Sequence, residues 1–224
     1  MTFGAGMADI NLNDVEIMAL DEQSSRQARS LLYHSYRNEP TFKYLLDAGR
    51  SGYKQRIRAT IRELIRLHFE CGETVLGVIH KKDRRVLGVV FVSNVGLKMD
   101  ISRQFRWRLK MTLTAGLEGT RRYIHYFNDV QRSLPDKAHK IVSLIGIHPE
   151  FQKQGLGRLL MQSVHKQVDQ DAGAIGVFLD TGNNRYLNFY ESLGYERFAD
   201  IKMGAELTEV VLFRANPNYV EAAA

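Results

Sequence analysis

Two glycines two residues apart, Gly155 and Gly157, predict a binding site for phosphate groups. They follow an apolar run and a turn with Pro149, and they precede a long amphipathic segment. The first four N–H groups of a helix lack partners within the helix and the helix dipole is positive there, so an anion is stabilised. Glycine also lets the backbone approach the anion without an intervening Cβ. A pyrophosphate cradle is therefore predicted, with packing of the helix as the alternative. No third glycine at dinucleotide-binding spacing and no Gly-Lys-Ser/Thr follows, which disfavours dinucleotides and nucleoside triphosphates.

The elements around this turn are predicted to form one mixed sheet with helices packed on it. The segment 140–147 is almost continuously apolar, as expected of a strand buried on both faces. The segments 74–80 and 86–95 are rich in Val, Ile and Phe and are separated by a polar turn, which predicts an antiparallel hairpin. Further strands are predicted at 15–20, 174–179, 195–203 and 207–213, and helices between 24 and 40 and at 41–47, 51–69, 155–170 and 183–193.

The segment 97–135 fits both a strand pattern and a helical pattern. Apolar residues alternate with polar ones from 105 to 113, but Phe105, Leu109 and Leu113 also share one helical face. Arg, Lys, Gln, Leu and Met favour helix, and apolar residues continue at helical spacing from Tyr123 to Leu134. We therefore expect two helices in this segment.

The composition is that of an ordinary globular domain, with 224 residues of which 44% are hydrophobic and 25% charged. We expect a single domain over 13–215, an N-terminal extension over 1–12, a helical insert over 97–138 and a C-terminal tail over 216–224. No apolar stretch approaches the ~18 residues of a membrane helix, and the start lacks the pattern of a secretory signal. Cys71 is the only cysteine, which excludes an internal disulfide and a four-thiolate metal site. These observations predict a cytoplasmic protein with no membrane partner and no metal.

The net charge of +6 is concentrated in the segment 97–140, which holds ten basic and four acidic residues. A second basic stretch covers 50–66. A polyanion could bind such a surface, and Arg103, Arg106 and Arg108 around Trp107 suggest phosphate contacts with stacking. No recognised nucleic-acid motif accompanies them, so solvated helix faces are the simpler explanation and no nucleic-acid partner is expected.

The segment from Gln152 to Gly157 resembles the Gln/Arg-x-x-Gly-x-Gly/Ala signature of the GCN5-related N-acetyltransferases (GNATs). As in that family, it stands after a buried strand and before a long helix. Asn183, Tyr190 and Gly194 resemble the family's second motif, and the segments 139–149 and 38–42 are similar to its puromycin N-acetyltransferase-like branch. The resemblance covers about residues 13–213. It implies an α/β fold of the mixed α+β kind: a central mixed, mostly antiparallel sheet of about seven strands flanked by helices, with a helical insert before the central strand.

The resemblance also implies roles for individual residues. In such enzymes the backbone of the central strand, here Ile145, Gly146 and Ile147, pairs with the pantetheine arm of acetyl-CoA. The glycine turn holds the pyrophosphate, which assigns Gln152, Lys153, Gln154, Gly155, Leu156, Gly157 and Arg158 to cofactor binding. Asn183 would contact the pantetheine. Tyr190 would face the thioester sulfur, where a phenol can donate a proton to the leaving thiolate; a core aromatic on an amphipathic helix is the alternative.

An amine acceptor must lose a proton to become nucleophilic, but the sequence nominates no clear general base. Ser143 lies on the buried strand where related proteins often carry a carboxylate, and a hydroxyl is a poor direct base. The other candidates are His139, His148, Glu73, Asp129 and Glu150, and the base is left unassigned. Cys71 is disfavoured as an acyl-carrying nucleophile because the sequence signals no basic partner for it.

We therefore expect an acetyl-CoA-dependent N-acetyltransferase that transfers the acetyl group directly to a primary amine of a small molecule in a ternary complex. The oxyanion is expected to meet a strand N–H. The insert is expected to wall the acceptor pocket through Trp107, Tyr123, Tyr126 and Phe127. One alternative is a peptide or protein amine, with the basic insert favouring neutral or acidic acceptors by repulsion. The other is a non-catalytic CoA-binding regulatory or nucleic-acid-binding protein. The chain is expected to be a monomer or a homodimer.

Overall fold

A computed structural model describes residues 10–94 and 101–221 and contains one seven-stranded sheet. The strands are β1 (Val15–Ala19), β2 (Thr74–His80), β3 (Val86–Asn94), β4 (Lys140–Ile147), β5 (Gly176–Thr181), β6 (Glu196–Met203) and β7 (Leu207–Ala215). Their spatial order is β1-β2-β3-β4-β5-β7-β6. Only the β4–β5 pair is parallel among the described strands. The mixed, mostly antiparallel sheet expected from the sequence is confirmed.

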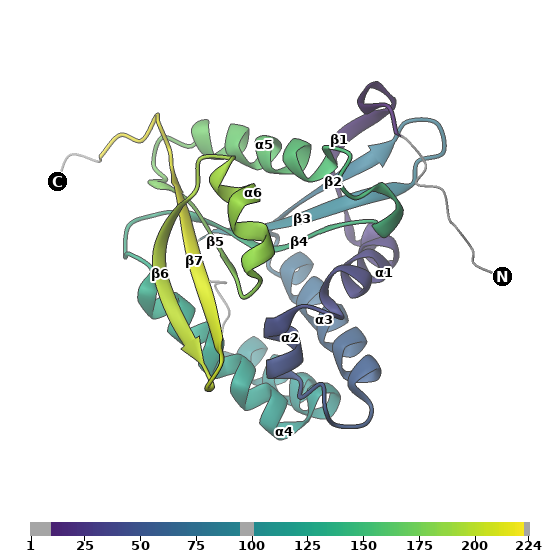
Figure 1. Ribbon diagram of the computed structural model, residues 1–224, viewed down its shortest axis with the longest axis vertical. Coiled ribbons are helices and arrows are strands. Elements are labelled where there is room, and N and C mark those ends of the chain that lie inside the picture. The colour runs from purple at the N-terminus through teal and green to yellow at the C-terminus, as the bar shows by residue number, and fades with distance from the viewer. Residues whose placement is uncertain (1–9, 95–100, 222–224) are drawn as a thin grey trace.

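Helices cover both faces of the sheet (Figure 1). One face carries α1 (Ser25–Tyr36), α2 (Pro40–Leu45), α3 (Tyr53–Glu70) and α4 (Ile101–Ser133). The other face carries α5 (Leu156–Asp169) and the short α6 (Leu187–Glu191). Short 3₁₀ segments lie at Leu12–Asp14, Glu22–Ser24, Pro149–Phe151 and Asn184–Tyr186. Because their apolar residues recur at helical spacing, α1, α3 and α5 each bury an apolar stripe.

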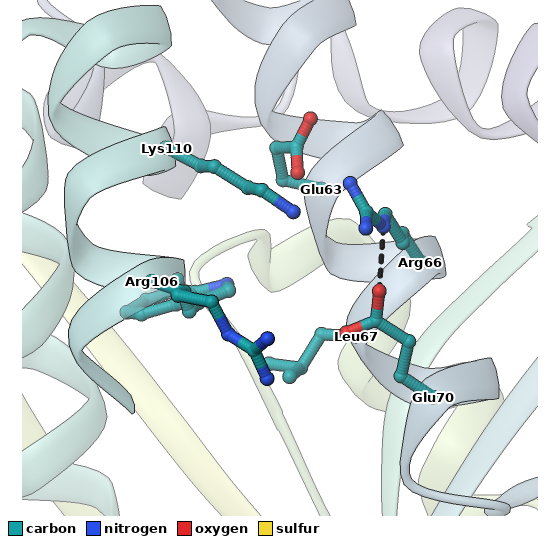
Figure 2. A pocket seen from close by; sticks show the side chains of 7 residues that line it. Glu63, Arg66, Leu67, Glu70, Arg106 and Lys110 are labelled. Carbon is teal, nitrogen blue, oxygen red and sulfur yellow. Dashed lines mark hydrogen bonds and ion pairs between the residues drawn. The ribbon is translucent and has the colours of Figure 1, made fainter. Parts of the chain in front are cut away.

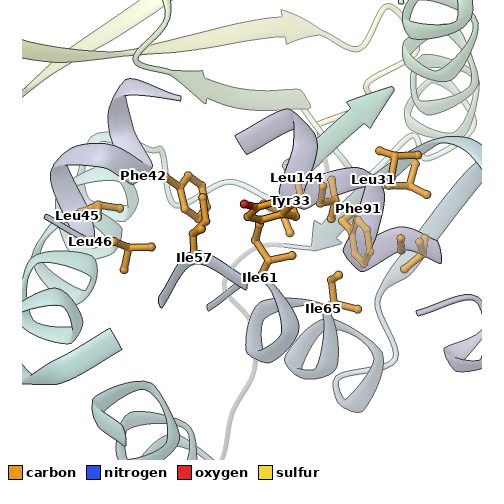
Figure 3. Close-up of a cluster of buried hydrophobic side chains, with 14 of the residues drawn as sticks. Leu31, Tyr33, Phe42, Leu45, Leu46, Ile57, Ile61, Ile65, Phe91 and Leu144 are labelled. Carbon is orange, nitrogen blue, oxygen red and sulfur yellow. The ribbon is translucent and has the colours of Figure 1, made fainter. Parts of the chain in front are cut away.

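The sheet separates two hydrophobic cores. On the α1 side, Leu31, Ile61 and Phe91 belong to one cluster (Figure 3). On the α5 side, Leu160 and Val90 belong to the other. Val90 and Phe91 are neighbours in β3 and lie in opposite clusters, since successive side chains of a strand point to opposite faces. The central strands are thereby fixed from both sides, as the apolar run of β4 predicts.

The segment 97–135 forms two helices, as expected, and they meet at a kink within α4. Gly116 has φ 82° and ψ 164°, which lies outside the helical region and bends α4 there. The face shared by Phe105, Leu109 and Leu113 points to solvent, whereas Met111 is fully buried. Residues 97–100 of this segment lie outside the described residues.

Two predicted boundaries at the second motif were wrong. The strand predicted at 174–179 is β5, Gly176–Thr181, because Ala174 still belongs to the turn after α5, where its N–H donates to the carbonyl of Asp171. The helix predicted at 183–193 is a 3₁₀ turn followed by α6, with the side chain of Asn183 accepting from the N–H of Arg185 at its start. Such side-chain caps compete with a regular helix and shift its first residue.

The central strands β4 and β5 diverge. Their parallel pairing covers Lys140 with Val177 and Ile141 with Phe178. Phe91 lies opposite Leu144 and Val92 opposite Val142, so Ser143 is the additional residue of a β-bulge in β4. A bulge bends its strand and increases the local twist. The sheet is consequently open between the ends of β4 and β5, next to Ile147 and Thr181.

Candidate active site

The open edge of β4 carries the three residues expected to pair with a pantetheine arm. The N–H of Ile145 donates to the hydroxyl of Tyr36, at 3.0 Å, and the carbonyl of Ile147 accepts from Nε2 of Gln152, at 3.2 Å. A Cβ at Gly146 would lie 2.6 Å from Oγ of Ser35, so α1 packs directly on the strand backbone. These polar backbone groups of β4 are thus held by side chains instead of by β5.

The glycine turn leads into α5 as the sequence predicts. Gly155 is the N-cap of α5 with φ 86°, a left-handed conformation that favours glycine, and no described side chain caps this helix. Leu156 is 1% exposed and anchors the first turn in the core. A Cβ at Gly157 would meet nothing closer than 3.5 Å, from Phe189. Packing therefore does not require glycine at position 157, and binding of a pyrophosphate by the first-turn N–H groups stays a prediction.

The side chains of the turn hold it in place. Oε1 of Gln154 accepts from the N–H of Ile10 at 2.8 Å, which ties the segment before β1 to the turn. Nη2 of Arg158 donates to Oγ of Ser192 at 2.8 Å and so connects α5 to the end of α6. Lys153 has φ 62°, a left-handed conformation unusual for a residue with a Cβ. These contacts fix the direction of the backbone N–H groups expected to hold the pyrophosphate.

Tyr190 lies on α6, in the core on the α5 side of the sheet, and is 7% exposed. No hydrogen bond to its hydroxyl is found within residues 10–94 and 101–221. Burial raises the pKa of Tyr190, and Tyr186, Glu39 and Asp180 raise it further. The phenol therefore keeps its proton at neutral pH and can act as a hydrogen-bond or proton donor.

Asn183 follows β5 and reaches across to the α1–α2 corner. Its Nδ2 donates to Oε2 of Glu39 at 3.2 Å, and its Oδ1 accepts from the N–H of Arg185 at the same distance of 3.2 Å. Burial raises the pKa of Glu39, and the hydrogen bond from Asn183 opposes that shift. The amide expected to contact the pantetheine is thus positioned beside the open edge by a carboxylate.

The sequence analysis does not identify two carboxyl groups near this edge, the half-buried Asp180 and the buried Glu209. Asp180 on β5 accepts from the hydroxyl of Tyr126 at 2.5 Å, and Glu209 on β7 accepts from Oγ1 of Thr41 at 2.5 Å. Burial is the main cause that raises the pKa of both Asp180 and Glu209, and the two groups interact. Ionising both carboxyl groups of such a pair at once is energetically unfavourable, so the pair retains one proton. The sequence feature that points to such groups is an acidic residue within an otherwise apolar strand.

The bases considered from the sequence are engaged elsewhere. His139 is buried, with Nδ1 2.7 Å from the carbonyl of Lys137, and burial lowers its pKa. His148 accepts from the N–H of Glu150 at 3.4 Å, and Glu150 itself is exposed. Glu73 and Asp129 bond to Asn94 and Arg132. Ser143 bonds to Ser93 at 2.8 Å, and Cys71 is the C-cap of α3. None of the described contacts brings these groups to Tyr190 or Ile145.

The aromatic residues expected to line an acceptor pocket lie in two regions, one near Asp180 and one at a cavity between α3 and α4. Tyr126 reaches Asp180, and the ring of Tyr123 lies 5.9 Å from that of Tyr126. Trp107 lies 5.7 Å from Tyr123 but also lines a surface cavity of about 200 Å³ between α3 and α4 (Figure 2). That cavity is lined by Glu63, Arg66, Leu67, Glu70, Arg106, Trp107 and Lys110. Phe127 is half-buried. The second half of α4 therefore borders the opening of the sheet, whereas cations of its first half face α3.

Membrane-spanning helices and clustered metal ligands are both missing from the described part of the chain. Within 10–94 and 101–221, no helix combines the length and apolar character needed to cross a membrane. The same residues contain no group of three or more His, Cys, Asp or Glu side chains arranged to hold a metal ion.

A mixed sheet that opens at β4 and β5 beside an uncapped, glycine-led helix defines the acetyltransferase class of fold. Residues 121–197 match the family model of the acetyltransferase (GNAT) domain. The chain is 38% identical over 58 residues to mycothiol acetyltransferase of Rhodococcus jostii, which covers 25% of this chain and 19% of that protein. Residues 121–197 are thus similar to a GNAT domain, and the chain shares the fold of acetyltransferases of known structure.

Solved structures share the whole fold at low sequence identity. One is a histone acetyltransferase HPA2 and related acetyltransferase from Corynebacterium glutamicum, with a TM-score of 0.67, 13% identity and coverage of 94% of this chain and 99% of that one. Another is an agmatine N-acetyltransferase, with a TM-score of 0.57, 15% identity and coverage of 89% and 98%. The mycothiol acetyltransferase is matched over about a fifth of its length, so its activity does not transfer to this chain by similarity alone.

Proposed function

We propose that the protein is an acetyl-CoA-dependent N-acetyltransferase that acts directly on a primary amine of a small molecule. The observation that carries the proposal is the divergence of β4 from β5 beside the first turn of α5. There the backbone at Ile145–Ile147 lies at the opening of the sheet, and the first-turn N–H groups of α5 have no described side-chain cap. A pyrophosphate at α5 and an extended arm along β4 make use of both features.

The reaction is a direct transfer in a ternary complex. The amine nitrogen attacks the thioester carbonyl carbon, the C–N bond forms, and the carbonyl π electrons move to the oxygen. The tetrahedral intermediate then collapses, the C–S bond breaks, and the electron pair leaves on sulfur. Tyr190 donates its proton to that thiolate and is reprotonated from the proton that the amine released. The products are the acetamide and CoA.

The amine's proton needs an acceptor, and Asp180 with Glu209 is our candidate. The pair carries one proton readily at neutral pH because burial and mutual repulsion disfavour the doubly ionised form. Its remaining negative charge lies near the opening and is bound by Tyr126 and Thr41. A group that is ionised but poorly solvated is a stronger base than the same carboxylate in water.

The acidic groups also bear on the choice of acceptor. Asp180, Glu209 and Glu39 surround the opening, whereas Arg106 and Lys110 of the basic segment line the cavity beside α3. These acidic groups oppose, at the opening, the repulsion of cations that the basic segment would cause. Amines that arrive as ammonium ions are favoured there. Membership of the puromycin N-acetyltransferase-like branch, a cytoplasmic location, the domain limits and the monomer or homodimer state stay predictions.

A thiol-release assay tests the proposal. The protein is incubated with acetyl-CoA and a panel of small primary amines of cationic, neutral and acidic character, and with peptides that carry free N-termini or lysines. CoA release that depends on a small cationic amine, with the acetamide identified by mass spectrometry, is the expected result. Release with peptides alone favours the protein-acceptor alternative. No release with any acceptor, by protein that binds acetyl-CoA, favours the non-catalytic CoA-binding alternative.

A further inference from the structure

The hydroxyl of Tyr36 is hydrogen-bonded on one side only. Its oxygen accepts from the N–H of Ile145 at 3.0 Å. A phenol is a donor as well as an acceptor, and its own O–H finds no acceptor within residues 10–94 and 101–221. Tyr36 is half-buried where it meets β4, so its O–H is free to donate to a ligand atom placed at the opening of the sheet.

The position of the Tyr36 hydroxyl indicates which ligand atom could accept its hydrogen bond. Tyr36 ends α1, and its ring lies 4.9 Å from that of Phe42, which fixes its direction. It meets β4 at Ile145, beyond the two residue pairs that join β4 to β5. Tyr190 belongs to the core on the opposite face of the sheet, and ionisation of its phenol would raise the pKa of Tyr36. The two phenols thus approach the same opening from the two faces of the sheet.

We propose that Tyr36 is a catalytic residue that donates its O–H to the thioester carbonyl oxygen of bound acetyl-CoA. This inference rests on the proposed function. Ile145 N–H, a strand donor of the kind expected to meet the oxyanion itself, instead donates to the Tyr36 oxygen and polarises the O–H. Tyr36 donates a hydrogen bond to the carbonyl oxygen, and Tyr190 donates a proton to the sulfur. As the amine attacks, the π electrons of the carbonyl move to oxygen and the Tyr36 hydrogen bond shortens; Tyr36 keeps its proton throughout.

The raised pKa of Tyr36 makes the phenol a hydrogen-bond donor and not a general base. Burial raises the pKa of Tyr36 well above its ordinary value; the bond from Ile145 N–H opposes this shift, and Tyr190, Glu39 and Asp180 add to it. The phenol is neutral at every working pH. A neutral donor preset at the site of developing negative charge stabilises a transition state without reorganisation.

Infrared difference spectroscopy with acetyl-CoA labelled with carbon-13 at the carbonyl tests the inference without an acceptor amine. A hydrogen bond from Tyr36 shifts the carbonyl band of the bound thioester to lower wavenumber relative to free acetyl-CoA. Tyr36→Phe should lose most of that shift, while acetyl-CoA binding measured by calorimetry persists. The matched control is Tyr33→Phe on the same helix, since Tyr33 is buried in the core and stacks under Arg58. Tyr33→Phe should keep the wild-type band.

Turnover gives a second readout once an acceptor is known. Loss of one oxyanion donor lowers kcat by about 100-fold to 1,000-fold, with little change in KM for acetyl-CoA, and Tyr33→Phe should leave kcat within about two-fold of wild type. An unchanged carbonyl band and kcat in a Tyr36→Phe protein that binds acetyl-CoA would overturn the inference alone. Failure of the wild type to bind acetyl-CoA would overturn the proposed function, and the inference with it.

Discussion

Oγ1 of Thr41 donates to Oε2 of Glu209 at 2.5 Å, directly against the backbone of Gly182. Thr41 lies on α2, Glu209 on β7, and Gly182 just after β5, so three distant segments meet at one hydrogen bond. A Cβ at Gly182 would lie 2.5 Å from the Thr41 oxygen and 2.8 Å from the Glu209 oxygen. The carboxyl pair beside the opening is therefore packed as tightly as a core.

Gly182→Ala should separate Thr41 from Glu209 and reduce the free energy of unfolding by about 1–3 kcal/mol, the usual cost of overpacking. Gly173→Ala is the matched control, because a Cβ there meets only Asp171, at 3.5 Å. Urea unfolding followed by circular dichroism measures both. Equal stability of the two variants would show that this contact is not tight.

Glu209→Gln should change the pH dependence of stability. Burial raises the pKa of Glu209 above its ordinary 4.5. The protonated group is favoured in the folded state, so its contribution is full below the unfolded pKa and is lost as pH rises toward the folded pKa. Glutamine does not titrate, so the stability of the variant relative to wild type should increase as pH rises from about 5. Denaturant unfolding at several pH values checks this, and parallel curves would refute it.

Tyr190→Phe should lower kcat by about 100-fold to 10,000-fold, the range for loss of a general acid. Its hydroxyl bonds to no described residue, so thermal stability and acetyl-CoA binding should stay at the wild-type level. Tyr195→Phe is the contrasting variant, because the hydroxyl of Tyr195 lies 3.2 Å from Nε2 of His165 in the core. It should lose about 1 kcal/mol of stability and keep kcat. The reverse pattern, measured by steady-state kinetics and calorimetry, would make Tyr190 a core aromatic only.

The sequence predicts the parts of the site that are local along the chain. The sequence predicts the turn from Gln152 to Gly157 and the helix after it, because the residues that signal the start of a helix are adjacent along the chain. The hairpin of β2 and β3 was found for the same reason. The divergence of β4 and β5 was not, because a bulge at Ser143 depends on the register with β3.

The side-chain contacts across the opening lay beyond sequence reasoning. Tyr36 and Ile145 are 109 residues apart, and Thr41 and Glu209 are 168 apart, so no periodicity links them. Asp180 and Glu209 were missed because they carry no motif of their own and interact only through the folded sheet. Asp180 in an apolar strand was the available clue, since an acidic residue is rarely buried without a partner.

The most direct test of the account is calorimetric titration of the protein with acetyl-CoA. Wild type should bind with micromolar affinity. Gly157→Glu should lose binding, because its carboxylate repels the pyrophosphate at the α5 N-terminus, while Gly157→Ala should fold normally, since a Cβ there comes no closer than 3.5 Å to Phe189. Folding of all three is checked by thermal unfolding. No binding by folded wild type, or equal binding by Gly157→Glu, would contradict the placement of the cofactor at α5 and β4.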